Sequence, residues 1–314
     1  MGKFIVKRIL SVIPVLIIVS VVIFSLVHLV PGDPAASMLG DMATPEDIEA
    51  LRIRMGLDRP LVEQYFVWIG NIFHGDFGMS VANNETVIGM IVSHLKPTIS
   101  LAAFSLMIAA VIAIPLGMVA AKMKRSPVDH GVTVLSLMGI SVPSFLLGLF
   151  LMMLFAVKLR WFPVSGYKEM SDGFAEHMKS LTLPAIALGF MNAALMMRMT
   201  RASMLEVLNS DYIKMAKAKG VHEFMIVAKH ALRNTLVTIL TVVGQSIVQA
   251  LSGAAVVESL FAIPGLGQLM VNSIGRRDYY VIQAIVLLIA VFNVLINMAV
   301  DLLYGVADPR VRLS

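Results

Sequence analysis

Six apolar runs without any Asp, Glu, Lys or Arg constrain the fold of this 314-residue chain more than any other feature. Crossing roughly 30 Å of hydrocarbon takes about 20 helical residues, and the shortest run has 17. None shows the period-2 alternation of a barrel strand. The sequence therefore predicts an all-α polytopic membrane protein with six transmembrane helices, at Ile9–Val30, Thr98–Ala121, Gly131–Val157, Leu181–Met197, Asn234–Val257 and Val281–Val300.

Composition and charge support this class and give an orientation. The chain is 58% hydrophobic and 14% charged, against about 25% charged in globular proteins. With the N-terminus in the cytoplasm, 15 of the 25 Lys and Arg residues lie on the inner side, whereas 14 of the 20 Asp and Glu residues lie outside. This distribution follows the positive-inside rule and predicts that both termini are cytoplasmic. The basic balance is thus no argument for nucleic acid.

Between the first two runs, residues 31–97 carry helix signals of their own. Thr44 is placed to cap a helix that has Pro45 at its first position and Gly56 as its stop. A second helix is expected to begin with Asp58 as its cap and an apolar stripe, Leu61, Tyr65, Trp68, Ile69 and Ile72. We expect this segment to cover the outer face of the bundle, with a docking site for a soluble partner as the alternative.

Searches for catalytic and cofactor motifs exclude several function classes. The single Gly-Lys pair is Gly2-Lys3, which leaves no room for the glycines of a phosphate-binding loop. The seven histidines show no paired metal spacing, and cysteine is absent. The sequence "GDFG" at 75–78 lacks every companion motif of a kinase and is interpreted as a turn. We therefore expect no catalytic site, metal site or bound cofactor in this chain.

Polar side chains inside a membrane run are candidates for function because burying them in lipid is costly. Gln245, Gln249 and Ser252 fall on one face of the fifth run and could line a path for a polar solute. Hydrogen bonding between helices is the alternative. Glu258 is a further candidate at the outer mouth, where a structural turn is the alternative reading.

One inner segment, residues 198–233, is basic and has helical spacing. Apolar and small residues recur at intervals of three or four from Ile213 to Ala231, with lysines on the other sides. This pattern predicts an amphipathic helix, or two short helices broken at Gly220, where a positive φ costs least. Such a helix could lie on lipid headgroups or dock in a groove of another protein.

Nine motifs, in order and nearly from end to end, give the chain a resemblance to a known family. They are "RILSVIPVL", "LVPGDPA", "GLDRPLVEQY", "GDFGMS", "SVPSFLLG", "DYIKMAKAKG", "HALRN", "VVESLFAIPGLGQL" and "RRDYYVIQ". The sequence resembles the permease subunits of binding-protein-dependent ABC importers, in the dipeptide, oligopeptide and nickel branch. Of the family's general inner motif, Ala216, Gly220 and Leu232 match, whereas Lys214 stands where that motif has glutamate.

The resemblance implies that the inner segment is a coupling helix seated in a groove of an ATPase. The residues it assigns to this role are Asp211, Tyr212, Ala216, Lys217, Ala218, Lys219, Gly220, His230, Leu232 and Arg233. It further implies a type I importer permease fold in the bacterial or archaeal cytoplasmic membrane. The implied partners are a second permease, two ATPases that carry ATP and Mg, and an extracytoplasmic solute-binding protein.

These expectations divide the chain into four parts: residues 1–30, a cytoplasmic tip and first span; 31–97, the outer segment; 98–305, a five-helix core that includes 198–233; and 306–314, a cytoplasmic tail. The expected function is ATP-driven uptake of di- and oligopeptides. The alternatives are uptake of a nickel chelate or glutathione, or a membrane sensor or scaffold that couples to ATPases without translocating a solute.

Overall fold

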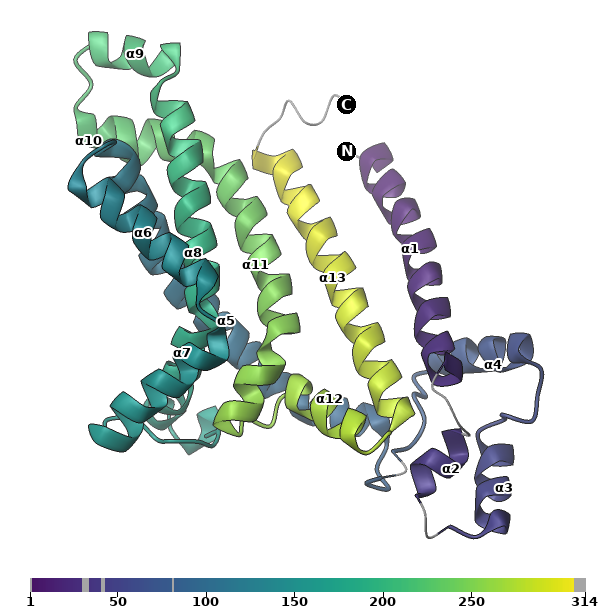
Figure 1. Cartoon of the computed structure of the whole chain (residues 1–314). Helices are drawn as coiled ribbons and strands as arrows, with labels where there is room; N and C mark the ends of the chain where they lie inside the picture. The colour runs from purple at the N-terminus through teal and green to yellow at the C-terminus, as the bar shows by residue number, and fades with distance from the viewer. Residues whose placement is uncertain (1, 30–33, 41–42, 81, 308–314) are drawn as a thin grey trace. The chain divides into compact units, whose positions relative to one another are not determined.

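The computed structural model describes residues 2–29, 34–40, 43–80 and 82–307, and these residues are helical with short connections (Figure 1). Within them no strand forms beyond one isolated bridge, between Met79 and Thr86. The predicted tail 306–314 lies outside the described residues from 308 onward. The elements are α1 (Gly2–Leu29), α2 (Pro34–Leu39), α3 (Pro45–Arg54), α4 (Leu61–Phe73), α5 (Val87–Lys122), α6 (Pro127–Ser141), α7 (Ser144–Leu151), η1 (Met152–Lys158), η2 (Met170–Asp172), α8 (Phe174–Leu208), α9 (Asp211–Ala218), α10 (Glu223–Met225), η3 (Ile226–Ala231), α11 (Leu232–Phe261), α12 (Leu266–Gly275) and α13 (Tyr279–Ala307).

Four of the predicted runs lie in helices long and apolar enough to cross a membrane: α5, α8, the continuous stretch Glu223–Phe261, and Tyr279–Leu303 of α13. The first run is helical as well from Ile9 to Leu29, the part that lies in α1. The part of α1 with described side chains, Leu10–Ser25, is apolar but shorter than a full span. That the first run crosses the membrane therefore stays a prediction.

The third run, Gly131–Val157, is not the single helix that we predicted. It forms two helical pieces, Pro127–Ser141 and Ser144–Lys158, that are bent by 102° relative to each other. The cause is Pro143, since its ring disfavours helical geometry at the preceding residue. Val142 is accordingly extended, with ψ 119°, and Pro143 starts the next piece. The run is thus a broken span or a re-entrant loop.

The chain forms two compact units, and each is described by itself. The first comprises Met1–Lys96 and Pro264–Val294, and the second comprises Pro97–Ile263 and Leu295–Ser314. The predicted boundaries at 30 and 97 instead separate the outer segment from the membrane spans, and they stay a prediction.

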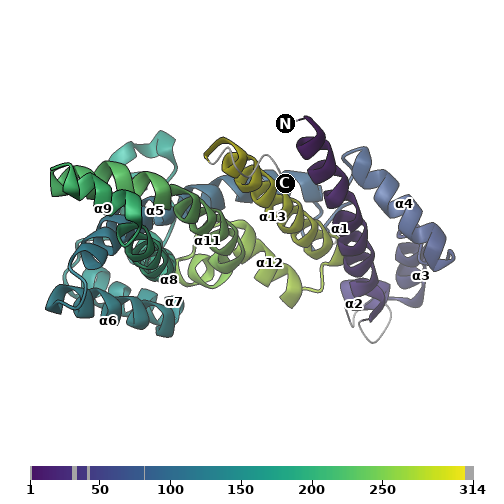
Figure 2. The ribbon, with the colours of Figure 1, turned by 90° about the horizontal axis from the view of Figure 1, so that it is seen from above.

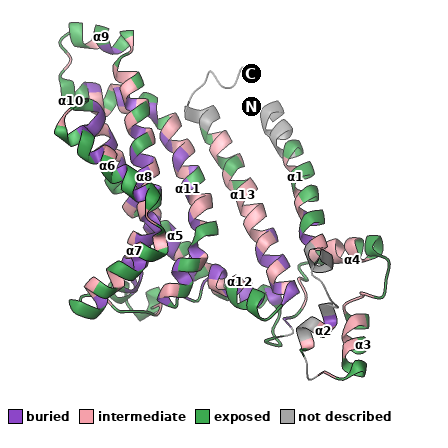
Figure 3. Cartoon of the chain, viewed as in Figure 1, coloured by how far each residue is buried: buried purple, intermediate pink, exposed green. Residues whose placement is uncertain are grey.

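Helix α8 is the centre of the second unit. It packs against α6, α7 and α11 (Figure 2). In an apolar stretch of 18 residues, 67% of α8 is buried, against 28–33% in the other helices long enough to span a membrane. Figure 3 shows this burial along α8. Small residues permit the packing: a Cβ at Gly189 would lie 2.6 Å from the Ser105 carbonyl oxygen, so only glycine fits there. Leu181, Leu188 and Phe261 belong to the apolar core around it.

In the first unit, the outer segment begins with a well-capped helix. The Thr44 hydroxyl accepts from the Asp47 amide at 3.2 Å, and the Asp47 carboxylate accepts from the Thr44 amide at 3.1 Å. The Thr44 hydroxyl also donates to this carboxylate, which lowers the pKa of Asp47. The predicted stop is present as well, since Gly56 follows α3 with a φ of +68°.

The second outer helix, α4, differs from the prediction at its start. It begins at Leu61, and its N-cap is Pro60 with no side-chain hydrogen bond, so Asp58 is not the cap. Proline pre-sets the φ angle at the helix entrance. A separate apolar core, built from the start of α5, α12 and the first part of α13, holds this unit together; Val87, Leu266 and Ile285 are among its buried members.

Candidate functional site

The inner segment forms a helical excursion between α8 and α11. After α8 ends at Leu208, α9 runs from Asp211 to Ala218, the chain turns at Gly220, and α10 and the π-helical turn η3 lead into α11. Gly220 has a φ of +77° and no neighbour within 4 Å of where a Cβ would stand. The predicted break is therefore present, and glycine is needed there for its conformation rather than for space. Figure 1 shows α9 at the tip of the second unit.

Burial separates the predicted coupling residues into two groups. Ala216, His230 and Leu232 are half-buried, and with the buried Ile213 they face the body of the unit. The other predicted residues are exposed: Asp211, Tyr212, Lys217, Ala218, Lys219, Gly220 and Arg233. Large apolar side chains accompany this exposed group, namely Tyr212 at 43%, Met215 at 61%, Phe224 at 67% and Met225 at 41%. Exposed apolar groups on a projecting helix mark an interaction surface.

Two polar contacts fix the excursion to its surroundings. The Asn234 side-chain amide donates to the Tyr212 hydroxyl at 2.8 Å, and so ties α9 to the start of α11. Lys122, at the end of α5, lies 3.4 Å from the Glu223 carboxylate of α10. The second contact is exposed and contributes little energy, but it shows that the inner loop and the excursion are neighbours.

An ion pair that we did not predict joins α6 to α8, between the buried Asp129 carboxylate and the partly exposed Arg201. Arg201 donates to both carboxylate oxygens of Asp129, at 2.5 and 2.9 Å, and the Arg125 amide adds a third bond at 2.9 Å. Asp129 is 3% exposed. The sequence Ser126-Pro127-Val128-Asp129 has an N-cap residue followed by an acidic third helical residue. This pattern indicates the start of a helix, but it does not identify Arg201 on α8 as the partner of Asp129.

The predicted path residues lie on α11 of the second unit, and they differ in accessibility. Gln245 and Ser252 are exposed, and Gln249 is half-buried with its amide 3.6 Å from the Met191 sulfur. Glu258 is fully buried and accepts a hydrogen bond of 2.6 Å from the Thr98 hydroxyl of α5. The first three thus share an open polar face, whereas Glu258 joins two helices within the core.

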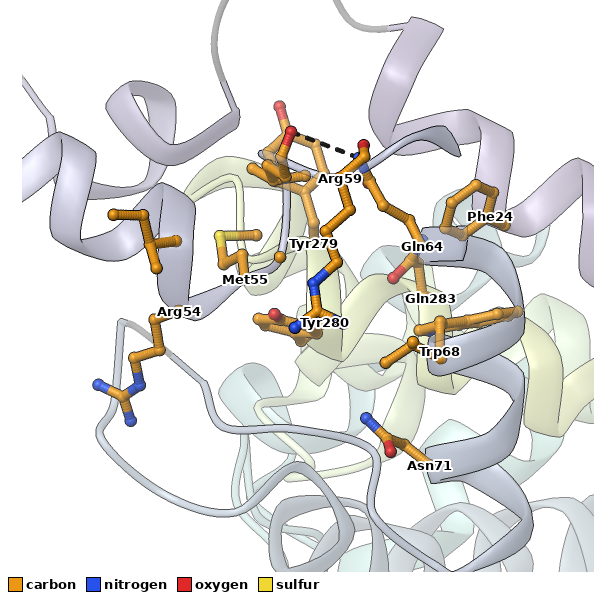
Figure 4. A pocket seen from close by; sticks show the side chains of 14 residues that line it. Phe24, Arg54, Met55, Arg59, Gln64, Trp68, Asn71, Tyr279, Tyr280 and Gln283 are labelled. Atoms are coloured by element: carbon orange, nitrogen blue, oxygen red, sulfur yellow. Dashed lines mark hydrogen bonds between the residues drawn. The ribbon is translucent and has the colours of Figure 1, made fainter. Parts of the chain in front are cut away.

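Two cavities open in the first unit, and the sequence predicted neither. Figure 4 shows the first, of about 200 Å³, where Arg59 reaches over Tyr280 while Trp68 and Gln283 form another wall. The second, of about 350 Å³, is lined by Asn83, Glu85, His94, Arg276 and Asp278 among others. Across the described residues no three His, Asp or Glu side chains stand close enough to hold a metal ion.

Comparison with known proteins decides the family. The model of the binding-protein-dependent transport system inner membrane component matches residues 113–313, and the model of the N-terminal part of such a membrane component matches residues 1–102. The chain belongs to this family. It is therefore the membrane component of a transport system that works with a binding protein and an ATPase, rather than an enzyme.

The relatives of this permease are similar over their whole length. A peptide transport system permease protein of Brucella abortus is 44% identical over 99% of both chains. A peptide ABC transporter permease protein of Sinorhizobium fredii is 39% identical, over 99% of this chain and all of the relative. The glutathione transport system permease protein of Shigella flexneri is 40% identical over 99% of both chains.

A solved structure confirms the fold of the permease. The MetNI methionine ABC transporter in its inward-facing conformation matches 70% of this chain and 97% of its own, with a TM-score of 0.59 and 18% identity. The predicted type I importer permease fold is thereby confirmed.

Proposed function

We propose that this permease subunit moves di- and oligopeptides across the cytoplasmic membrane, with energy from separate ATPase subunits. The observation that carries the proposal is the projecting inner segment with its exposed apolar side chains. A thousandfold accumulation costs about 4 kcal/mol, and the sequence has no phosphate-binding loop of its own. The energy then has to enter through contact with a partner that binds ATP and Mg.

The coupling step follows from the shape of the segment. Met215 and Phe224 flank the Gly220 turn and are well placed to enter an apolar groove of an ATPase, while Lys217 and Lys219 contact its acidic rim. The half-buried Ala216, His230 and Leu232 pass the motion to the body of the unit. Closure of the nucleotide-bound ATPases then biases the spans between inward and outward access.

The proposed assembly has this chain, a homologous second permease, two cytoplasmic ATPases and an extracytoplasmic solute-binding protein. The inner segments carry the positive excess, so we propose that both termini are cytoplasmic. Gln245, Gln249 and Ser252 are the proposed contacts along the solute path. Glu258 contributes by holding α11 to α5.

Peptides are the proposed substrate class because full-length relatives of 39–44% identity are named as peptide permeases. The glutathione permease at 40% supports a second candidate, since glutathione is itself a tripeptide. A nickel chelate is the remaining transport alternative. A sensor or scaffold that moves nothing is the rival from another class.

The test is uptake into vesicles by the reconstituted complex of all subunits. Labelled dipeptide accumulation that needs ATP supports import, and glutathione as competitor compares the two substrates. Stimulated ATPase activity without any uptake would instead favour the sensor. Valine at Gly220 tests coupling, because a β-branched residue is strained at positive φ. We expect uptake to fall while all subunits assemble, whereas Gly275→Val, at an open helical site, leaves uptake unchanged.

A further inference from the structure

Helix α4 carries two apolar faces, although a helix at the surface of a soluble protein needs only one. Leu61, Tyr65, Trp68 and Ile72 recur along the first face. A second stripe, Val62, Phe66, Ile69 and Phe73, follows at intervals of four, three and four residues, about a quarter turn away. Each face therefore needs a covering partner.

The middle of the first face, Tyr65 and Trp68, packs on α1, whereas Leu61 at its start is exposed. The Tyr65 hydroxyl lies 2.8 Å from the Ser20 hydroxyl, which is buried. The Phe24 ring stands 5.5 Å from the Tyr65 ring, edge to face, and 5.8 Å from Trp68. These contacts fix α4 to α1 in one rotational setting, so the direction of the second face is fixed as well.

Three of the four members of the second face are exposed, and only Ile69 is half-buried. Val62 is 68% exposed, Phe66 64% and Phe73 84%, and no residue of α4 is buried. Figure 3 shows the exposed positions on this helix. Three large side chains on one stripe exceed the scattered apolar residues of an ordinary water-facing surface.

The contacts of α13 show that α4 lies near one end of a long apolar helix. The Gln283 amide donates to the Ile23 carbonyl at 3.3 Å, next to Phe24, on which α4 packs. Gln283 lies four residues after Tyr279, the first residue of a spanning helix. At 1.5 Å per residue this is about 6 Å along α13 from its first residue, so α4 packs near the end of a helix that is long and apolar enough to span a membrane.

The neighbouring surface of α1 supports lipid as the partner. Ile17, Ile18, Val21 and Val22 are 44–64% exposed, on the part of α1 that reaches the level of Ile23. In Figure 1, α4 crosses the lower end of α1 instead of running alongside it. The second face of α4 therefore extends the exposed apolar surface of α1 sideways.

We propose that α4 is an interfacial helix whose Val62, Phe66 and Phe73 side chains enter the acyl-chain boundary of the outer leaflet. The opposite side carries Glu63, Asn71 and His74 around the exposed Val67, and we place it toward water. The helix thereby holds the outer segment against the membrane and keeps the cavity of Figure 4, which Trp68 and Asn71 help to line, at the membrane surface.

The chain has no cysteine, so single labels can be placed without removing any native residue. Four variants of the full complex in nanodiscs, Phe66→Cys, Phe73→Cys, Glu63→Cys and Asn71→Cys, each carry one small fluorophore. We expect brominated phospholipids to quench the labels at 66 and 73 severalfold more than those at 63 and 71. Aqueous iodide is expected to give the reverse order.

The proposal is overturned if iodide quenches the labels at 66 and 73 as strongly as those at 63 and 71. A label at 66 or 73 that is open to iodide, but is protected when the solute-binding protein is added, would assign this face to that protein instead. If Phe66→Cys fails to assemble, Val62→Cys provides the same test on the same stripe.

Discussion

The Ser80 hydroxyl donates a hydrogen bond of 2.5 Å to the Asp278 carboxylate, across 198 positions of the sequence. Ser80 ends the "GDFGMS" turn and Asp278 lies in "RRDYYVIQ", two motifs that the sequence presents separately. The Arg276 guanidinium adds a bond of 2.8 Å to the Asn83 side chain. The turn after α4 is thereby fastened to the connection between α12 and α13 within the first unit.

Removing the Ser80 hydroxyl is expected to loosen this connection. Asp278 is 2% exposed, and its second carboxylate oxygen accepts no hydrogen bond from any described residue. Ser80→Ala would leave both oxygens of this buried carboxylate without a donor among the described residues, at a cost of about 1–3 kcal/mol. Hydrogen exchange at residues 78–84 should accelerate, whereas Ser171→Ala, which removes an exposed bond to Glu169, leaves it unchanged. Equal exchange in both variants would show that the bond contributes nothing.

Gly78 and Gly75 form a matched pair for testing how tightly this turn packs. Both have a positive φ, +84° and +81°. An added Cβ meets nothing within 4 Å at Gly75, but it lies 3.0 Å from the Tyr280 ring at Gly78. Gly75→Ala should cost about 1–2 kcal/mol for the backbone alone, and Gly78→Ala should cost more. Thermal unfolding of the purified protein measures both, and an equal loss would mean that the Tyr280 ring moves aside freely.

The Asp129–Arg201 pair predicts strongly coupled mutational effects. Asp129→Asn leaves the partly exposed Arg201 guanidinium facing a neutral amide, which we expect to cost about 1–3 kcal/mol. Arg201→Gln should cost a similar amount, but the double variant should lose far less than the two losses together, because neither charge is then left alone. Thermal unfolding of the four proteins gives the coupling energy. Purely additive losses would mean that the two side chains do not interact.

The periodicity of apolar residues and the conformational preferences of single residues allowed much of this fold to be predicted from the sequence. The apolar runs predict the long helices, Thr44 predicts the N-cap of α3, and Gly220 predicts a helix break. Each of these features depends only on a residue and its near neighbours in the chain. The bend of 102° between the two helical pieces on either side of Pro143 could not be predicted in size. Proline permits a bend, but the packing of the two pieces sets its angle.

The contacts between distant segments could not be read from the sequence. Asp129 with Arg201, and Ser80 with Asp278, each need the tertiary fold to bring them together. Of the stripe predicted on α4, Tyr65 and Trp68 pack on α1, but the stripe also included Ile69 and did not separate the second face from the first. The burial of Glu258 against Thr98 of α5 likewise depends on the tertiary fold, and its predicted place at the outer mouth stays a prediction.

The last prediction separates packing from solute contact on α11. Glu258 and Thr98 are both almost fully buried, so Glu258→Gln, which keeps an acceptor for the Thr98 hydroxyl, should leave the concentration for half-maximal peptide uptake unchanged. Glu258→Ala removes that acceptor and opens a void, and it should lower the yield of assembled complex. Ala substitutions at Gln245 and Gln249 should do the opposite, raising the half-maximal concentration of a normally assembled complex. Uptake titrations in proteoliposomes decide between them, and a raised half-maximal concentration for Glu258→Gln alone would place this carboxylate on the solute path.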